Sequence, residues 1–388
     1  MLYTTSAAMQ RIRSRLRTAA ASPASRDTVI AAWLAWQASA AAARKTVCIT
    51  DFPSPAESGD PHDFFSEGPY WWPDPENPDG PYIRRDGRVN PDRFTAHDDA
   101  LGRICSDPQL LALAAYHLGI PRFYDAAKEK LRAFFLDPAT RMNPHLDYAQ
   151  AIRGRCPGRG IGIIDATGLH RLIFALDLME EDGVSDETTD GVRAWLGEFY
   201  RWLRTSKNGL EEKYHGNNHS IWYTSLTMAL ARLSGDNAGF ADDCSYFGGM
   251  MAKQLREDGA FADETTRTNA FGYCCYNLTA AALVCELAHF GGVDLWHASY
   301  GEGRSMRAAV GFLVPYLTNP YKWPYQQING QVPEAPFALT AAAHRLPDDG
   351  AQRALHARSG MDPMRNMNPL GPMELYFAPE GTDGDTAE

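Results

Sequence analysis

The chain has 388 residues, a length that fits either two average domains or one large helical toroid or barrel. Its 48 acidic and 37 basic residues give a formal net charge of −11. This charge argues against broad non-specific binding of nucleic acid, but it allows an anionic substrate that meets locally gathered arginines. Seven scattered cysteines without CxxC spacing indicate buried thiols, and their odd number excludes a complete set of internal disulfides.

Export and membrane signals are weak in this sequence. No apolar run comes near the roughly 20 residues that span a bilayer, so no membrane segment is expected. The N-terminal stretch MLYTTSAAMQRIRSRLRTAAASPAS has arginines spread through it and no continuous apolar segment, unlike a secretory signal peptide. The residues alone therefore indicate an intracellular protein, or an export signal that lies outside the given chain.

Helical periodicity begins in the Ala-rich segment 28–45, where Trp33 and Trp36 form an aromatic face. The segment 51–93 is too rich in Pro and Gly for a helix and too aromatic for a disordered linker. We expect it to form an ordered lid or cleft wall that is anchored by Tyr70, Trp71 and Trp72.

The rest of the chain is dominated by helical patterns, predicted over 96–118, 121–135, 166–179, 190–205, 220–233, 240–256, 271–290 and 295–317. No convincing run of alternating β-branched residues occurs, so the fold class is all-α. Antiparallel helix pairs without solenoid repeat signatures favour an (α/α) toroid or incomplete barrel. We expect residues 1–347 to form this single domain, and residues 348–388 to form an irregular C-terminal tail with a disordered end.

The stretch KYHGNNHSIWYTSL places polar residues immediately before an apolar helix. Asn and Gly favour turns and caps, which predicts that Asn218 and His219 lie at a helix mouth. His215 and His219 are four apart, as in some zinc sites, but Gly216 and two asparagines intervene and no third ligand can be named. We therefore predict no metal or other cofactor.

Three further stretches concentrate polar and aromatic groups: GPYWWPDP near Tyr70, residues 143–165, and DETTRTNAFGYCCYNL at 263–278. A weaker one, NPYKWPYQQING, contains Trp323. Together with the helix mouth they fit β-elimination from a 4-linked uronic acid. That reaction needs a neutralised C6 carboxylate, a base for the C5 proton and an acid for the departing O4.

The residue types for this chemistry are present. Asn218, His219 and Arg267 can neutralise a carboxylate, and Tyr273 can act as base and acid if a neighbouring positive charge lowers its pKa. Because six residues separate Arg267 from Tyr273, the two side chains meet only if a bend or helix start lies between them. Taken singly, the histidine fits a helix cap, and the tyrosines and the two tryptophans fit core packing.

NNHSIWY, followed later by REDGAFADETTRTNAFGYCCYNL, resembles the alginate lyase superfamily of helical-toroid polysaccharide lyases. GPYWWPDPENPDGPYIRRDGRVNP is similarly typical of the N-terminal part of that family. NPHLDYAQAIRGRCPGRGIGIID is similar to a branch that includes alginate and β-glucuronan lyases. The resemblance covers residues 64–327 and implies a cleft that holds an acidic polysaccharide, with no nucleic-acid or membrane partner and a periplasmic or secreted location.

The resemblance also implies roles for individual residues. Asn218 and His219 would neutralise the carboxylate, Arg267 would assist and tune, and Tyr273 would be the catalytic tyrosine, with Tyr276 as its rival. The implied substrate-binding residues, which would line sugar subsites or bind carboxylates, are Tyr70, Trp71, Trp72, Gln150, Arg153, Arg155, Arg159, Tyr276 and Trp323.

Stereochemistry narrows the substrate. In β-D-mannuronate and β-D-glucuronate the C5 hydrogen and O4 lie on one side of the ring, so one tyrosine can serve both. In α-L-guluronate they lie on opposite sides, so two groups would be needed, and His219 would be the second.

Two other functions compete with a lyase. One is a glycoside hydrolase with two carboxylates such as Asp147 and Asp165, and the other is a non-catalytic carbohydrate-binding protein that stacks sugars on tryptophans.

Overall fold

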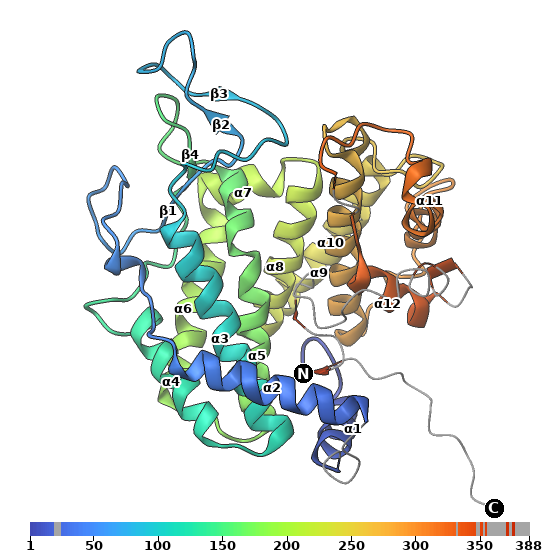
Figure 1. Ribbon diagram of the computed structural model, residues 1–388. Coiled ribbons are helices and arrows are strands. Elements are labelled where there is room, and N and C mark those ends of the chain that lie inside the picture. The colour runs from blue at the N-terminus through green and yellow to red at the C-terminus, as the bar shows by residue number, and fades with distance from the viewer. Residues whose placement is uncertain are drawn as a thin grey trace, which may run out of the picture.

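Long helices make up most of the chain (Figure 1). The computed structural model describes residues 1–18, 25–330, 333–346, 350–351, 354, 370–371 and 375–376. The α-helices in these residues are α1 (Ser6–Thr18), α2 (Arg26–Ala43), α3 (Ala96–Leu118), α4 (Arg122–Phe135), α5 (Leu169–Glu181), α6 (Glu187–Thr205), α7 (Lys207–Lys213), α8 (Asn218–Ser234), α9 (Asn237–Gln254), α10 (Ala270–Phe290), α11 (Met306–Thr318) and α12 (Pro336–Arg345). The short 3-10 helices are η2 (Ile49–Asp51), η3 (Gly160–Gly168), η4 (Glu264–Thr266) and η5 (Pro320–Lys322).

The helices form an inner and an outer layer. The inner helices α3, α5, α8 and α10 contact one another in that order. Outer helices pack against them: α4 packs on α3, α9 on α8 and α11 on α10. Most residues of α8 and α10 are buried, so both helices lie inside the fold. By length and composition α10 is also apolar enough to cross a membrane, but 83% of its apolar window is buried, so it serves as a core helix here.

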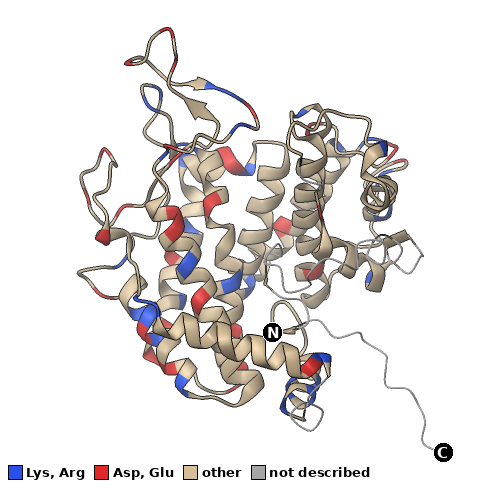
Figure 2. Cartoon of the chain, in the orientation of Figure 1, with Lys and Arg blue, Asp and Glu red and all other residues tan. Residues whose placement is uncertain are grey.

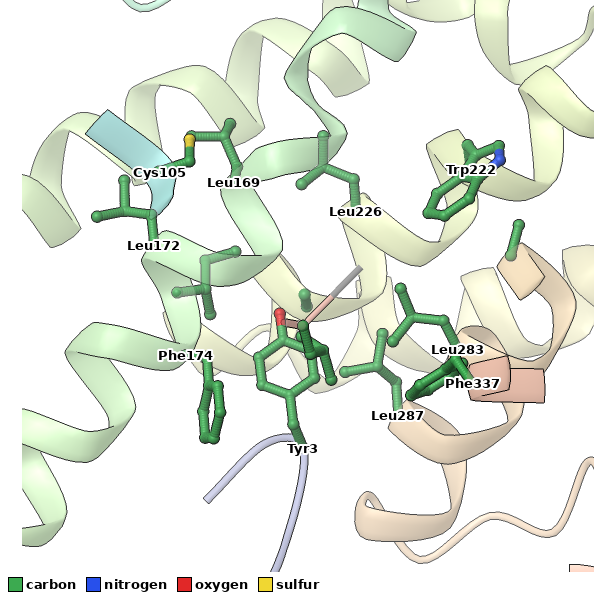
Figure 3. Close-up of a cluster of buried hydrophobic side chains, with 14 of the residues drawn as sticks. Tyr3, Cys105, Leu169, Leu172, Phe174, Trp222, Leu226, Leu283, Leu287 and Phe337 are labelled. Atoms are coloured by element: carbon green, nitrogen blue, oxygen red, sulfur yellow. The ribbon is translucent and has the colours of Figure 1, made fainter. Parts of the chain in front are cut away.

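The two ends of the described chain meet at one end of the helical layers. The Tyr3 hydroxyl lies 3.0 Å from Nδ1 of His170, and the Thr4 hydroxyl donates to the carbonyl oxygen of Tyr376 at 2.7 Å. Figure 3 shows Tyr3 between Phe174 of α5 and the apolar side chains of α10. These contacts close the apolar core at the end of the helices away from the strands (Figure 1).

At the opposite end, four short strands carry the irregular segments. They are β1 (Phe65–Glu67), β2 (Trp71–Trp72), β3 (Ile83–Arg84) and β4 (Tyr148–Ala151). β1 pairs with β4 in parallel, and β2 pairs with β3 in antiparallel fashion. Residues 65–93 and 143–159, called the loop lobe here, therefore form one unit above the helix ends (Figure 1).

The structure confirms an all-helical core and most predicted helices, but the predicted helix over 295–317 was wrong at its start. Gly301 and Gly303 adopt positive φ angles of 125° and 69°, and α11 begins only at Met306, capped by the Ser305 side chain. Helices α1, α7 and α12 were not predicted, nor were the short strands. Most of the predicted tail from 348 lies outside the described residues, although Leu370, Leu375 and Tyr376 are buried in the core.

Candidate active site

A pocket of about 680 Å³ lies where the first turns of α8 and α10 meet the loop lobe. The predicted site residues that line it are Tyr70, Trp71, Gln150, Arg159, Asn218, His219, Arg267, Tyr273 and Tyr276. They come from segments that are far apart in the sequence, so the fold brings the separate motifs into one site. Trp72, Arg153, Arg155 and Trp323 do not line it.

The first side of the pocket, called the helical wall here, is the start of α8. The Asn217 side chain caps this helix by accepting from the backbone N–H of His219, which leaves Asn218 and His219 in its first turn. Oε1 of Glu264 accepts from the backbone N–H of Asn218 at 2.9 Å and from its side-chain Nδ2 at 2.8 Å. Oε1 of Glu212 lies 2.9 Å from Nδ1 of His219. Each residue at the helix mouth is thus backed by a carboxyl group.

Glu212 and Glu264 are fully buried behind the residues that they hold. Burial raises the pKa of both carboxyl groups above the ordinary value. The contacts with His219, for Glu212, and with Asn218, for Glu264, offset only part of this increase. The second carboxyl oxygen of each glutamate has no hydrogen-bond partner among the described residues. Neither glutamate was predicted, although Glu212 lies only seven positions before His219, within reach of a short α7 turn.

Tyr273 stands at the start of α10 beside two partners. Its hydroxyl lies 2.5 Å from the hydroxyl of Tyr70, and Cζ of Arg267 lies 3.7 Å from the centre of its ring. The predicted bend exists: η4 ends at Thr266, Arg267 is extended, and α10 begins at Ala270. The pair therefore meets despite its separation of six positions.

The pKa of Tyr273 lies above its ordinary value. Burial is the largest cause, and the nearby Tyr70 adds to it, while Arg267 acts in the opposite direction. Asp86 of the loop lobe weakens this pull, because it binds the Arg267 guanidinium through both oxygens, at 2.8 and 3.2 Å. Burial raises the pKa of Asp86, but the contacts with Arg267, Arg84 and Thr268 together outweigh burial and leave that pKa below its ordinary value. The expected net lowering of the Tyr273 pKa is thus absent in the free protein.

Tyr276 lies one helical turn after Tyr273 and also lines the pocket. Its ring packs on Trp222 with 4.8 Å between centroids, and 36% of the residue is exposed. Among the described residues, the cation–ring contacts include an arginine over Tyr273 but none over Tyr276. The surroundings of Tyr273 therefore fit proton transfer better.

The second side of the pocket, called the loop wall here, belongs to the loop lobe. Arg159 donates from Nε to the carbonyl oxygen of Gln150 at 2.9 Å and from Nη2 to its side-chain Oε1 at 3.1 Å. The guanidinium also lies 5.9 Å from the ring of Trp71. Burial lowers the pKa of Arg159, since desolvation disfavours its charge. Arg84 also lines this wall and was not predicted.

The remaining predicted residues have contacts outside the pocket. Trp72 donates to the carbonyl oxygen of Arg88, and Arg153 binds the Glu67 carboxylate. Arg155 donates to the carbonyl oxygen of Tyr82, and its Cζ lies 5.2 Å from the centre of the Trp71 ring. Trp323 stacks on Phe271 with 4.6 Å between centroids. Figure 2 shows that the loop lobe carries several basic residues.

Comparison with known proteins adds a family and a fold. The family model "Alginate lyase" matches residues 49–323. An alginate lyase from Bacteroides ovatus is similar over 98% of this chain and 99% of its own, with 31% identity and a TM-score of 0.86. No curated protein matches the sequence.

More distant solved structures share the fold. Alginate lyase A1-III from Sphingomonas species A1 has 17% identity and a TM-score of 0.54, over 97% of this chain and 98% of its own. A form of alginate lyase A1-III with one histidine replaced by alanine, complexed with a tetrasaccharide, has 17% identity and a TM-score of 0.59, over 98% of each chain. The predicted (α/α) toroid is thereby confirmed.

Proposed function

This chain belongs to the alginate lyase family and is a polysaccharide lyase, and from that premise we propose that it cleaves a β-1,4-linked polyuronate by β-elimination. Polymannuronate, as found in alginate, and β-glucuronan are the proposed substrates. The observation that carries the proposal is the position of Tyr273, whose hydroxyl meets Tyr70 and whose ring meets Arg267 in the pocket that also holds Asn218 and His219.

The helical wall supplies the groups that neutralise the uronate carboxylate. Asn218 donates one side-chain N–H to Glu264, and its second side-chain N–H is left to donate to the substrate. Nδ1 of His219 is hydrogen-bonded to Glu212, and Nε2 faces the pocket. For Nε2 to donate to the substrate carboxylate, the Glu212–His219 pair must hold two protons, one between the two residues and one on Nε2. Donors fixed in this way stabilise the negative charge that moves onto the carboxylate as the C5 proton leaves.

Tyr273 is the proposed proton-transfer group. As the phenolate, it takes the C5 proton; the C–H electron pair forms the C4–C5 double bond, and the C4–O4 bond breaks with its electrons on O4. The tyrosine then returns the proton to O4, which leaves as a hydroxyl group. The Arg267 guanidinium over the ring favours the phenolate that starts the cycle.

The stereochemistry of a single tyrosine fits mannuronate and glucuronate, in which the C5 hydrogen and O4 share one side of the ring. Guluronate would require a second group, and His219 is the proposed one. A hydrolase finds less support, because Asp165 is the single carboxylic residue among those that line the pocket. Asp147 instead accepts from Trp202 Nε1 outside the pocket.

The test mixes the protein with polymannuronate, polyguluronate and β-glucuronan separately, with a chelator present, and follows the ultraviolet absorbance of the new double bond. We expect a rise with polymannuronate or β-glucuronan. A rise with polyguluronate alone would contradict the single-tyrosine mechanism, and no rise with any of the three would overturn the proposed function.

Because such polymers are found outside cells, we also propose that the protein acts in the periplasm or outside. Fractionation of the native host, followed by immunodetection, tests this location. Recovery only with cytoplasmic markers would contradict it.

A further inference from the structure

Gln150 of the loop wall is held by two residues behind the pocket. Oδ1 of Asp165 accepts from Nε2 of Gln150 at 3.0 Å, and Oδ2 of Asp165 accepts from the hydroxyl of Ser66 at 2.6 Å. That hydroxyl in turn accepts from the backbone N–H of Gln150 at 2.7 Å. Asp165 therefore fixes Gln150 both directly and through Ser66.

The backbone of Gln150 shows that this support imposes a conformation. Its φ of 47° lies in the left-handed region, and no other non-glycine residue in the described part of the chain has a positive φ. Such a conformation persists only where surrounding contacts determine it, and it is concentrated at functional sites. Here it directs both oxygens of Gln150 toward Arg159, which donates to each of them.

A second carboxyl group, that of Asp98 in α3, lies within hydrogen-bonding reach of Asp165. Two carboxyl groups can share a hydrogen bond only if one of them carries a proton. Oδ1 of Asp98 is buried without a hydrogen-bond partner among the described residues, so ionisation of both carboxyl groups would leave a charged oxygen without a hydrogen bond, with Arg93 as the nearby cation.

We propose that Asp98 and Asp165 hold one proton between them, and that this shared proton lets the loop wall bind a uronate carboxylate at Arg159. Asp165 is a positioning residue for Gln150 and Arg159, and Asp98 sets the charge behind them. The binding part of this inference rests on the proposed function, because that function supplies the uronate substrate. The shared proton does not depend on the proposed function.

The physical reason is charge balance. With one proton on the pair, a single negative charge lies behind Arg159, and the guanidinium remains attractive to an anion. Loss of the proton adds a second negative charge in a poorly hydrated region, which weakens binding of a polyanion. The charged and titratable groups that face the pair are Arg93 and Asp99 beside Asp98, and Arg159, Glu212, His219 and Tyr276 beside Asp165.

The pH range follows from the surroundings of Asp98. Burial and the neighbouring Asp165 raise the pKa of Asp98 to about 9. The proton is therefore present at neutral pH and is lost as the pH rises through about 9. Asp98→Asn mimics the protonated form and should remove the pH dependence.

The substrate arm of the test measures KM between pH 7 and 10 with the polymer that gives product. For the wild-type protein we expect KM to rise by about fivefold or more across this range, since one unit charge is added close to the bound anion. Asp98→Asn should match the wild-type KM within about twofold at pH 7 and stay flat to pH 10. Asp92→Asn, which removes an exposed carboxyl group that does not face the pair, is the matched control and should follow the wild type.

The folding arm needs no substrate. An unfolded Asp is ionised above about pH 4, so a proton kept to about pH 9 in the folded state makes stability fall as the pH rises between these values. The Tm of the wild type should therefore fall by at least about 3 °C more than that of Asp98→Asn between pH 5 and 9. Equal Tm slopes would overturn the shared proton.

The two arms separate the possible failures. If the wild type and Asp98→Asn differ in the slope of Tm against pH but have parallel KM profiles, the role in substrate binding is overturned and the shared proton is supported. Absence of product from every polymer would refute the proposed function, while the Tm arm would still decide the shared proton.

The second variant, Asp165→Asn, tests the positioning role. It places an amide NH₂ against one of the two donors that Asp165 accepts from, Gln150 Nε2 or the Ser66 hydroxyl. KM at pH 7 should rise about tenfold with a smaller change in kcat. An unchanged KM would contradict the positioning role.

Discussion

The helical wall and the loop wall of the pocket hold their side chains in opposite ways. Asn218 and His219 stand in the first turn of a buried helix, and each meets a fully buried glutamate, Glu264 or Glu212, from another element. Gln150 lies in the short strand β4 and Arg159 lies in the loop before η3, and Arg159 donates two hydrogen bonds to Gln150. The helical wall fixes polar groups in one geometry, whereas the loop wall gathers positive charge around a less regular backbone.

This difference indicates a division of labour. Groups that stabilise the charge of a transition state must be fixed before the reaction, which suits the helical wall. Groups that attract a polyanion act by charge over a wider area, which suits arginines on the loop lobe of a protein with a net charge of −11. Changes in the helical wall should therefore lower kcat, and changes in the loop wall should raise KM.

The largest effect is expected from Tyr273→Phe, which removes the proposed base and acid. We expect kcat to fall by about 10³-fold or more, because general acid–base groups contribute up to about 10⁴-fold. Tyr276→Phe is the matched control and should retain kcat within about tenfold. Equal losses in the two variants, measured by double-bond absorbance, would remove the distinction between these tyrosines.

The pH dependence of kcat/KM should show the next largest effect. Because the pKa of Tyr273 is raised, its phenolate is a minor form at neutral pH and becomes more abundant as the pH rises. We expect kcat/KM to rise by up to about tenfold per pH unit between pH 6 and 8. A flat or falling profile in this range would show that the reaction does not start from the phenolate.

Replacement of Glu212 tests the support of the helical wall. Glu212→Ala should lower kcat by about 10- to 100-fold with KM within about threefold, since it removes a buried charged hydrogen bond to His219. The neighbouring Glu211 is exposed and accepts instead from the backbone N–H of Gly160, so Glu211→Ala is the control. A rise in KM without loss of kcat would place His219 in binding alone.

Arg159→Ala tests the loop wall in the same assay. KM should rise about tenfold and kcat should change by less than about threefold, because a charged contact with the substrate is lost. Arg155 is exposed and lies outside the pocket, so Arg155→Ala should change KM by less than about threefold at moderate salt. The affinity of the wild type should also weaken with salt, and a salt-independent affinity would contradict this role of the arginines.

The smallest catalytic effect is expected at Trp323. Its ring stacks on Phe271 and packs beside Tyr316, outside the pocket. Trp323→Leu should lower the Tm by a few degrees and leave KM within about twofold. An increase of KM without a change in Tm would return Trp323 to the substrate-binding residues.

Much of the fold could be predicted because the helices carry local signals. The bounds of α3 were predicted correctly, since its apolar pattern ends at Gly119, which adopts a left-handed conformation there. The start of α11 was missed because the apolar residues Leu295, Trp296 and Tyr300 come just before the turn at Gly301 and Gly303 and were joined to the helical pattern that follows it. In that segment the Ser305 cap was the better signal.

The site was predictable where its residues lie in short motifs, as Asn218 with His219 and Arg267 with Tyr273 do. The residues that support them could not be found in this way. Asp86 lies 181 positions from Arg267, and Glu264 lies 46 positions from Asn218. Such pairs are set by how the loop lobe and the helices pack, and no local pattern encodes them.

The central claim is elimination, and the most direct test counts bonds. During digestion of the polymer that gives product, double bonds are measured by absorbance and new reducing ends by a chemical assay in the same samples. The account predicts one double bond for every new reducing end throughout the digestion. Reducing ends that form without double bonds would contradict it and would indicate hydrolysis.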